Sequence, residues 1–301
     1  MRHKEVPGFG ELGAPARVWG GRKVDPINEA LKIESSHFTG RRYGKSIELL
    51  EGLLKRKDLK PRQRFEALCR KAESLERLGK SRGALDILKA VTRAHPGEPL
   101  GFSLLGEYLF RVMEDSSGAL GALSKALELA PDDPDSHWWR GQVFQSGLND
   151  PKRARECYLS ALRSDSKYGP AMESLAGLAE SQGRWIEAVE WRKMHYLRER
   201  KAASLSAIAE LYLRLGNFPA SQKYSLSAVR RAPRDASVWL IRAKALSASG
   251  IAVGAIEALV RFSGLTNPKT GPLIFSRDMF WLEALLDNPK VSSIIRRFLA
   301  Q

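Results

Sequence analysis

Residues 119–132, ALGALSKALELAPD, decide the fold of this 301-residue chain. Four of their apolar residues are spaced three or four positions apart and share one face of a helix. These are Ala119, Leu123, Ala126 and Ala130. Alanine side chains on that face let a second helix approach closely, and the proline that follows ends the helix. The stretch therefore predicts a short amphipathic helix packed tightly on a neighbour.

The same helix returns at nearly constant intervals along the chain. Its small residue recurs in steps of 35, 35, 34, 33 and 34 residues, at Ala84, Ala119, Ala154, Ala188, Ser221 and Ala255. The helix before it carries its own small residue in steps of 34, 35, 35, 33 and 34, at Ala72, Gly106, Gly141, Ala176, Ala209 and Ala243. A unit that repeats in this way predicts a stacked array, in which each helix pair packs on its neighbours.

The turns between helices follow the same period. Five glycines are predicted to stop the first helix of a pair by adopting a left-handed conformation: Gly79, Gly147, Gly183, Gly216 and Gly250. The turns at 113–118 and 148–151 each hold one extra residue. Residues 185–201 depart from the pattern, since Arg192 and His195 replace an aromatic residue and an alanine and no proline follows. We expect a rotated, longer helix or unusual packing there.

Residues 27–267 resemble the tetratricopeptide repeat family. Its signature is a large residue, Leu and a small residue, an aromatic, then Ala, an aromatic, Ala and Pro. Trp239, Ala243, Gly250 and Ala255 match it in one repeat. The resemblance implies an all-α, right-handed solenoid of about seven antiparallel helix pairs. It also implies that first helices line a concave groove and second helices form an outer ridge.

Three regions are expected from composition and period. Residues 1–25 are rich in Gly and Pro and are predicted to form a flexible arm. Residues 26–267 are predicted to form the solenoid. Residues 268–301 are predicted to form capping helices, because a solenoid exposes apolar surface at its last repeat.

Composition bounds the class of partner and the compartment. Lys and Arg number 49 against 34 Asp and Glu, a formal net charge of +15. This balance favours nucleic acid, acidic protein or an anionic membrane as partner, unless the charge only solvates the surface. Two cysteines, Cys69 and Cys157, are too few for a disulfide framework and suggest a reducing, cytoplasmic location. No apolar run approaches the roughly 18 residues of a membrane span.

The sequence predicts no enzyme chemistry. The five histidines lack metal-ligand spacing, and no phosphate-binding G-x-x-x-x-G-K-[ST] loop is present. Ser103 does not stand in the G-x-S-x-G motif of a hydrolase. We therefore expect no catalytic residue, no metal site and no cofactor.

Groove residues are implied by the resemblance at one position after the small residue and three before it. The candidates are Glu73, Glu107, Trp138, Gln142, Glu173, Glu210, Leu240 and Lys244. The same rule places Cys69, Ser103 and Ser206 in the groove. This acidic surface suits a basic or mixed peptide, with Trp138 as anchor and Trp139 on the packed side. The alternatives are solvated glutamates, and a register shifted by one so that Trp138 is the large residue of the signature.

The second helices gather positive charge. The strongest candidates for a basic ridge are Arg192, Lys193, Arg198, Arg200 and Lys201. Two functions follow from these surfaces. The first is a non-enzymatic protein-interaction scaffold that holds a partner segment in the groove. The alternative is a nucleic-acid-binding repeat protein that uses the convex ridge. The sequence does not predict the oligomeric state.

Overall fold

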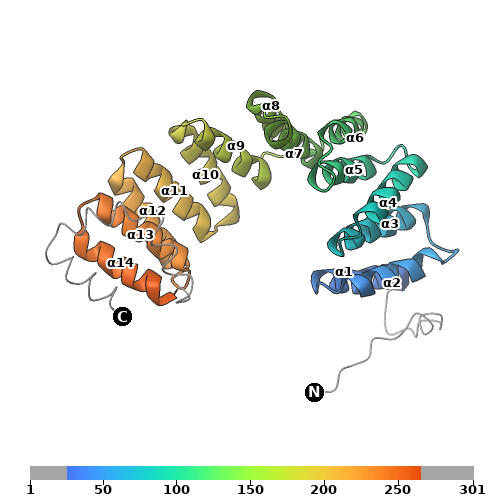
Figure 1. Ribbon diagram of the computed structural model, residues 1–301, viewed down its shortest axis with the longest axis horizontal. Coiled ribbons are helices and arrows are strands. Elements are labelled where there is room, and N and C mark those ends of the chain that lie inside the picture. The colour runs from blue at the N-terminus through green and yellow to red at the C-terminus, as the bar shows by residue number, and fades with distance from the viewer. Residues whose placement is uncertain (1–25, 266–301) are drawn as a thin grey trace, which may run out of the picture. The chain divides into compact units, whose positions relative to one another are not determined.

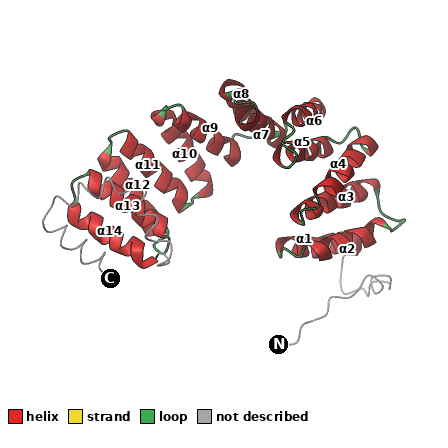
Figure 2. Ribbon diagram, in the orientation of Figure 1, coloured by secondary structure: helices red, strands yellow, loops and turns green. Residues whose placement is uncertain are grey.

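A computed structural model describes residues 26–265 of the chain. Within that range every regular element is a helix (Figures 1 and 2). The predictions of an arm at 1–25 and of capping helices at 268–301 lie outside the described residues.

Seven helix pairs make up the described part of the chain. The first helices are α1 (Pro26–Thr39), α3 (Pro61–Arg77), α5 (Pro99–Arg111), α7 (Pro134–Gln142), α9 (Gly169–Ser181), α11 (Ala202–Arg214) and α13 (Ala236–Ala248). The second helices are α2 (Tyr43–Leu54), α4 (Ser81–Ala94), α6 (Ser116–Leu129), α8 (Pro151–Ser164), α10 (Trp185–Glu199), α12 (Phe218–Arg231) and α14 (Ala252–Leu265). The predicted all-α array of about seven pairs is confirmed.

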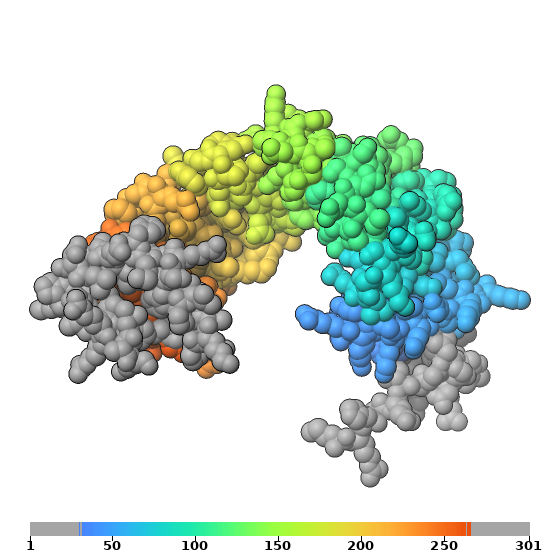
Figure 3. Space-filling model, viewed as in Figure 1, coloured from blue at the N-terminus to red at the C-terminus, as the bar shows by residue number. Residues whose placement is uncertain are grey.

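The helices divide into two compact units at Ser164 and Asp165. The first unit holds α1 to α8 and the second holds α9 to α14. Side chains of successive pairs follow one another in chain order within each unit (Figure 3).

Small residues let the two helices of a pair approach closely. Ala119, Ala154 and Ala188 are fully buried. At Gly141 an added Cβ would lie 2.4 Å from a ring carbon of Tyr158, and at Gly106 it would lie 2.5 Å from Leu123. Contacts this short leave no room for a side chain, which explains why the repeat keeps glycine at these two places.

Four of the predicted turn glycines have the left-handed backbone. Gly79, Gly183, Gly216 and Gly250 have φ between 67° and 74°. The residue after each donates its N–H to the carbonyl five positions back, as Lys80 does to Leu75 at 2.9 Å. This Schellman arrangement satisfies a carbonyl at the end of the first helix.

The prediction for Gly147 is wrong. Its turn takes up the extra residue in a π-helical segment, η2 (Val143–Gly147), and Asn149 is the left-handed residue, with φ 51°. Asp150 then donates its N–H to the carbonyl of Phe144 at 2.7 Å, six positions back instead of five. Gly147 is needed for space, because an added Cβ would lie 2.4 Å from the Ser116 hydroxyl.

Candidate partner-binding face of the first helices

All eight predicted groove residues lie on first helices, and none of them is buried. The small residues that precede several of them are buried completely or nearly so: Ala72, Ala176, Ala209 and Ala243 are at most 2% exposed. Each first helix therefore turns its small residue to the partner helix and the next residue away from it. We call these eight residues the first-helix face: Glu73, Glu107, Trp138, Gln142, Glu173, Glu210, Leu240 and Lys244.

Two further positions predicted in the groove are not available to a partner. Cys69 is 6% exposed, and its burial, with Glu73 and Glu66 nearby, raises the pKa of its thiol to about 12. Ser103 is 7% exposed and accepts a hydrogen bond from the Ser136 hydroxyl at 2.9 Å. Both side chains pack between helices, so the face is closed at these positions.

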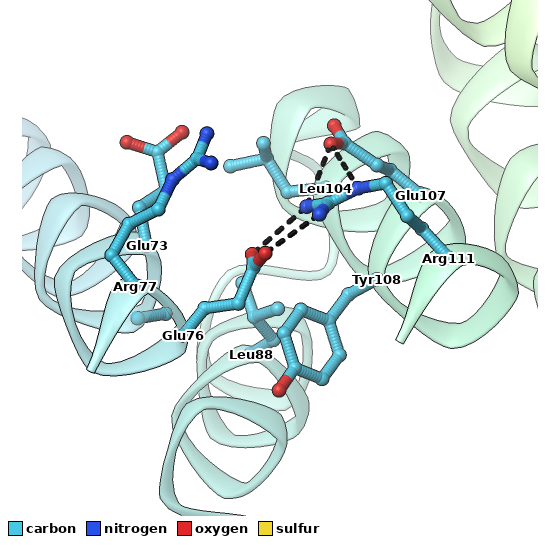
Figure 4. Close-up of a pocket in the computed structure, with 9 residues that line it drawn as sticks. Glu73, Glu76, Arg77, Leu88, Leu104, Glu107, Tyr108 and Arg111 are labelled. Carbon is cyan, nitrogen blue, oxygen red and sulfur yellow. Dashed lines mark hydrogen bonds and ion pairs between the residues drawn. The ribbon is translucent and has the colours of Figure 1, made fainter. Parts of the chain in front are cut away.

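Glu73 of α3 and Glu107 of α5 line one small cavity between these two helices (Figure 4). The cavity has a volume of about 50 Å³, which leaves space for water molecules only. Arg111 of α5 closes it by placing two guanidinium nitrogens 2.7 and 2.9 Å from the Glu76 carboxylate oxygens. Its Nε also donates to Glu107 at 3.2 Å.

Three carboxylates, of Glu73, Glu76 and Glu107, line this α3–α5 surface beside the guanidinium groups of Arg77 and Arg111. Desolvation by the surrounding protein raises the pKa of Glu73, and the nearby Glu107 carboxylate raises it further. Desolvation also raises the pKa of Glu107, although Arg111 acts in the opposite direction. A carboxylate with a raised pKa gains from a cationic neighbour, so the surface favours a positively charged group.

Sequence reasoning missed Glu76 and Arg111. Arg111 follows Glu107 by four residues and Glu76 by 35 residues, which is one repeat. Spacings of one helical turn and of one repeat are the signals that could have found this triad.

Two adjacent tryptophans lie on different sides of α7. Trp139 packs against the hydrophobic core of the first unit, as predicted. Trp138 is partly exposed, and its ring meets that of Trp139 edge to face with centroids 4.6 Å apart. Gln142 lies one turn further along α7, on the side of Trp138. An exposed tryptophan edge beside an amide can bind an apolar side chain and a backbone group together.

The α13 candidates lie against the end of the second unit. Leu240 packs partly on the cluster that Ala243, Leu246 and Ala255 form. Lys244, one turn further on, is partly buried. This part of the face is less acidic than the α3–α5 surface.

Arg192 does not lie on a free outer ridge. Its side chain is only 17% exposed and reaches back to α9, where Nε donates to Glu180 at 2.9 Å. Another nitrogen lies 3.6 Å from the Glu173 carboxylate. A predicted ridge residue and a predicted groove residue are thus ion-paired, since α10 turns this part of its surface toward α9.

Lys193 also faces inward. Its ammonium lies 5.3 Å from the ring centroid of Tyr212 and 5.9 Å from that of Tyr224. The Tyr212 hydroxyl also raises the pKa of Lys193 through a side-chain hydrogen bond. This cation serves to join α10 to α11 and α12.

The other three ridge cations lie where α10 ends. Arg198, Arg200 and Lys201 are exposed, and Lys201 pairs with Glu199 at 3.1 Å. Arg200 takes the left-handed conformation, φ 54°, that stops α10 without a proline. The helix has 15 residues, one more than α12, in line with the longer helix expected there. The five cations do not form one continuous basic surface.

Residues 26–265 lack two other kinds of feature. No cluster of three or more His, Cys, Asp or Glu side chains could hold a metal ion there. No helix in that range combines the length and the apolar character needed to cross a membrane.

Comparison with known proteins decides the family. A tetratricopeptide repeat model matches residues 145–203 and 206–261. Residues 145–203 and 206–261 of this chain are therefore tetratricopeptide repeats. Such proteins are in general protein-interaction scaffolds. No curated protein matches the sequence.

Solved structures of other tetratricopeptide repeat proteins share the fold. A repeat protein from Parabacteroides merdae is 15% identical with TM-score 0.52, over 86% of this chain and 97% of that one. PilW, a type IV pilus biogenesis factor, is 17% identical with TM-score 0.58, over 70% and 96%. YrrB, described as having an unusual peptide-binding site, is 15% identical with TM-score 0.52, over 65% and 96%. At these identities the likeness shows the fold alone.

Proposed function

We propose that this protein is a non-enzymatic scaffold that holds a segment of a partner protein on the first-helix face. One observation carries the proposal. Along six first helices the small residues pack inward while the polar and aromatic residues of the face stay unburied. A fold that needed these residues only for packing would not place Glu73, Trp138 and Gln142 at unburied positions.

The chemistry of the face indicates a basic or mixed partner segment. In the first unit, the carboxylates of Glu73 and Glu107 supply negative charge. Desolvation raises the pKa of both groups. On α7, Trp138 supplies an aromatic anchor of the kind on which binding energy concentrates. We include a cytoplasmic location in the proposal, because Cys69 and Cys157 are both free and buried.

Site-specific photocrosslinking tests the proposal directly. We would place the photoreactive residue p-benzoylphenylalanine at Gln142 and, as a matched control, at Lys125, an exposed residue on the second helix α6. Mass spectrometry would identify the adducts formed in cells. We expect protein adducts from position 142 and few from position 125. Equal labelling at the two positions would contradict the proposal.

A nuclease treatment in the same experiment distinguishes protein binding from the alternative of nucleic-acid binding. No comparison with known proteins supports that alternative. Adducts on the first-helix face should survive nuclease treatment and physiological salt, because contacts to phosphates weaken steeply with salt whereas apolar anchoring does not. Loss of all adducts after nuclease treatment would favour the alternative.

A further inference from the structure

A larger cavity lies at the corresponding place in the second unit. It has a volume of about 430 Å³ and lies between α9 and α11, with Trp185 of α10 at one side. Its lining includes the side chains of Glu180, Trp185, Glu210 and Arg214 and the backbone of Gly177.

The α9–α11 cavity matches the α3–α5 cavity position by position. Glu107 and Glu210 each follow the small residue of their helix, Gly106 and Ala209. An arginine stands four residues after each glutamate, Arg111 in the first unit and Arg214 in the second. The two cavities therefore share a glutamate and an arginine in one register.

The arginine does not close the second cavity. Arg111 binds Glu76 and Glu107 across the first cavity (Figure 4). The guanidinium of Arg214 lies instead over the Trp185 ring, 5.1 Å from its centroid.

Two other differences leave the second cavity open. Glu180, the counterpart of Glu76, is bound by Arg192 at 2.9 Å from within the unit. Gly177 stands where the first unit has Glu73, and no atom lies within 4 Å of a Cβ added there. The place that a guanidinium fills in the first unit is thus vacant in the second.

Two polar atoms on α11 lack partners, and one of them belongs to Glu210, which lines the cavity. Oε2 of Glu210 and Oγ of Ser206 are buried, and neither has a hydrogen-bond partner among the described residues. The two residues are four positions apart and therefore lie on the same side of the helix. A buried carboxylate oxygen without a donor is unfavourable, and a cationic donor is the group that relieves it best.

We propose that the α9–α11 cavity receives a lysine or arginine side chain of the partner segment. The cationic end donates to Glu210, and the aliphatic stem lies along Ala207 and Trp185. This inference rests on the proposed function, because it supposes that a segment lies on the first-helix face. The inference adds which part of the face recognises the basic residue of the partner segment. That part is the second unit, where Arg214 lies over Trp185 and leaves the cavity open.

Selection from a random peptide library tests the inference without knowledge of the natural partner. Phage-displayed random 12-residue peptides would be selected on the full chain at physiological salt. We expect the bound peptides to share a Lys or Arg at one position. The affinity of a selected peptide should fall by about tenfold or more in Glu210→Gln. Glu128→Gln, at an exposed carboxylate on the second helix α6, is the control and should leave the affinity unchanged because it lies outside the first-helix face.

A double-mutant cycle then assigns the contact to Glu210. Replacement of the shared basic residue of the peptide by norleucine should weaken binding to the natural chain but not to Glu210→Gln. Circular dichroism would verify that both variants are folded.

The outcomes separate this inference from the function on which it rests. Peptides that bind without a shared basic residue, or that bind Glu210→Gln with unchanged affinity, would overturn the inference and leave the proposed function standing. Failure of the natural chain to select any peptide would overturn both.

Discussion

Arg111 reaches from α5 to α3 and places two nitrogens 2.7 and 2.9 Å from the carboxylate of Glu76. This contact joins consecutive first helices of the first unit across one repeat. The corresponding place in the second unit, beside Glu210, is an open cavity.

Replacement of Arg111 by Met should destabilise the first unit. The change removes a two-nitrogen contact to Glu76, whose side chain is 14% exposed. We expect a loss of about 1 kcal/mol in unfolding free energy, modest because Arg111 itself is 37% exposed. The midpoint of urea unfolding measures it. Lys125→Met, which breaks the exposed pair with Glu128, is the control and should cost at most about 0.5 kcal/mol. Equal effects would show that the Arg111 contact adds nothing beyond a surface pair.

Glu73→Gln should change the pH dependence of stability in a defined direction. The pKa of Glu73 is raised in the folded state above its usual 4.5, so the folded protein holds this proton more tightly than the unfolded chain. Its contribution to stability is therefore present at low pH and is lost as the pH rises through the raised pKa. The variant should gain stability relative to the natural chain as the pH rises from the usual value of 4.5 through the raised pKa.

Glu51→Gln is the control of opposite sign. A hydrogen bond from Lys71 lowers the pKa of Glu51, so its contribution appears above the ordinary pKa and is lost as the pH falls through the lowered one. That variant should lose stability relative to the natural chain as the pH rises. Urea unfolding at several pH values measures both, and matching trends would contradict the assignment.

Two glycines on first helices should respond oppositely to alanine. At Gly141 the new Cβ would lie 2.4 Å from the fully buried Tyr158, so we expect a loss of about 1–3 kcal/mol. At Gly177 no atom lies within 4 Å of the new Cβ, so alanine should stabilise α9 by about 0.5–1 kcal/mol. Thermal unfolding would compare the two, and destabilisation by Gly177→Ala would refute the close-approach account.

Asn149→Gly should stabilise the turn that precedes α8. Asn149 has φ 51°, a conformation that glycine adopts without strain. We expect a gain of up to about 1 kcal/mol. Gly79→Ala, at φ 74° in the corresponding turn before α4, should cost a similar amount. The midpoints of thermal unfolding report both changes, and a loss in Asn149→Gly would mean that its side chain has a role in the turn.

The repeat period predicted the helix pairs closely, because each pair is a local pattern of small and apolar residues. Ala119 and Ala255, predicted on second helices, lie on α6 and α14. The turn at Gly147 was missed because an extra residue can be absorbed either in the turn or, as here, in a π-helical segment before it.

The site could be predicted only in part. The period identified which residues leave the packed side of each first helix, among them Glu73 and Glu107. The period does not predict which side chains the nearby arginines contact. Arg192 pairs with Glu180 of α9 and Arg214 lies over the Trp185 ring, and residue spacing does not fix either contact.

Trp138→Ala gives the most direct test of the claim that a partner lies on the first-helix face. Binding would be measured by isothermal titration calorimetry, with the partner segment recovered by crosslinking from position 142. We predict a loss of about 2 kcal/mol or more, or about 30-fold in Kd. Phe218→Ala, an exposed aromatic at the start of the second helix α12, should leave Kd unchanged. A folded Trp138→Ala variant that binds with the affinity of the natural chain would contradict the account.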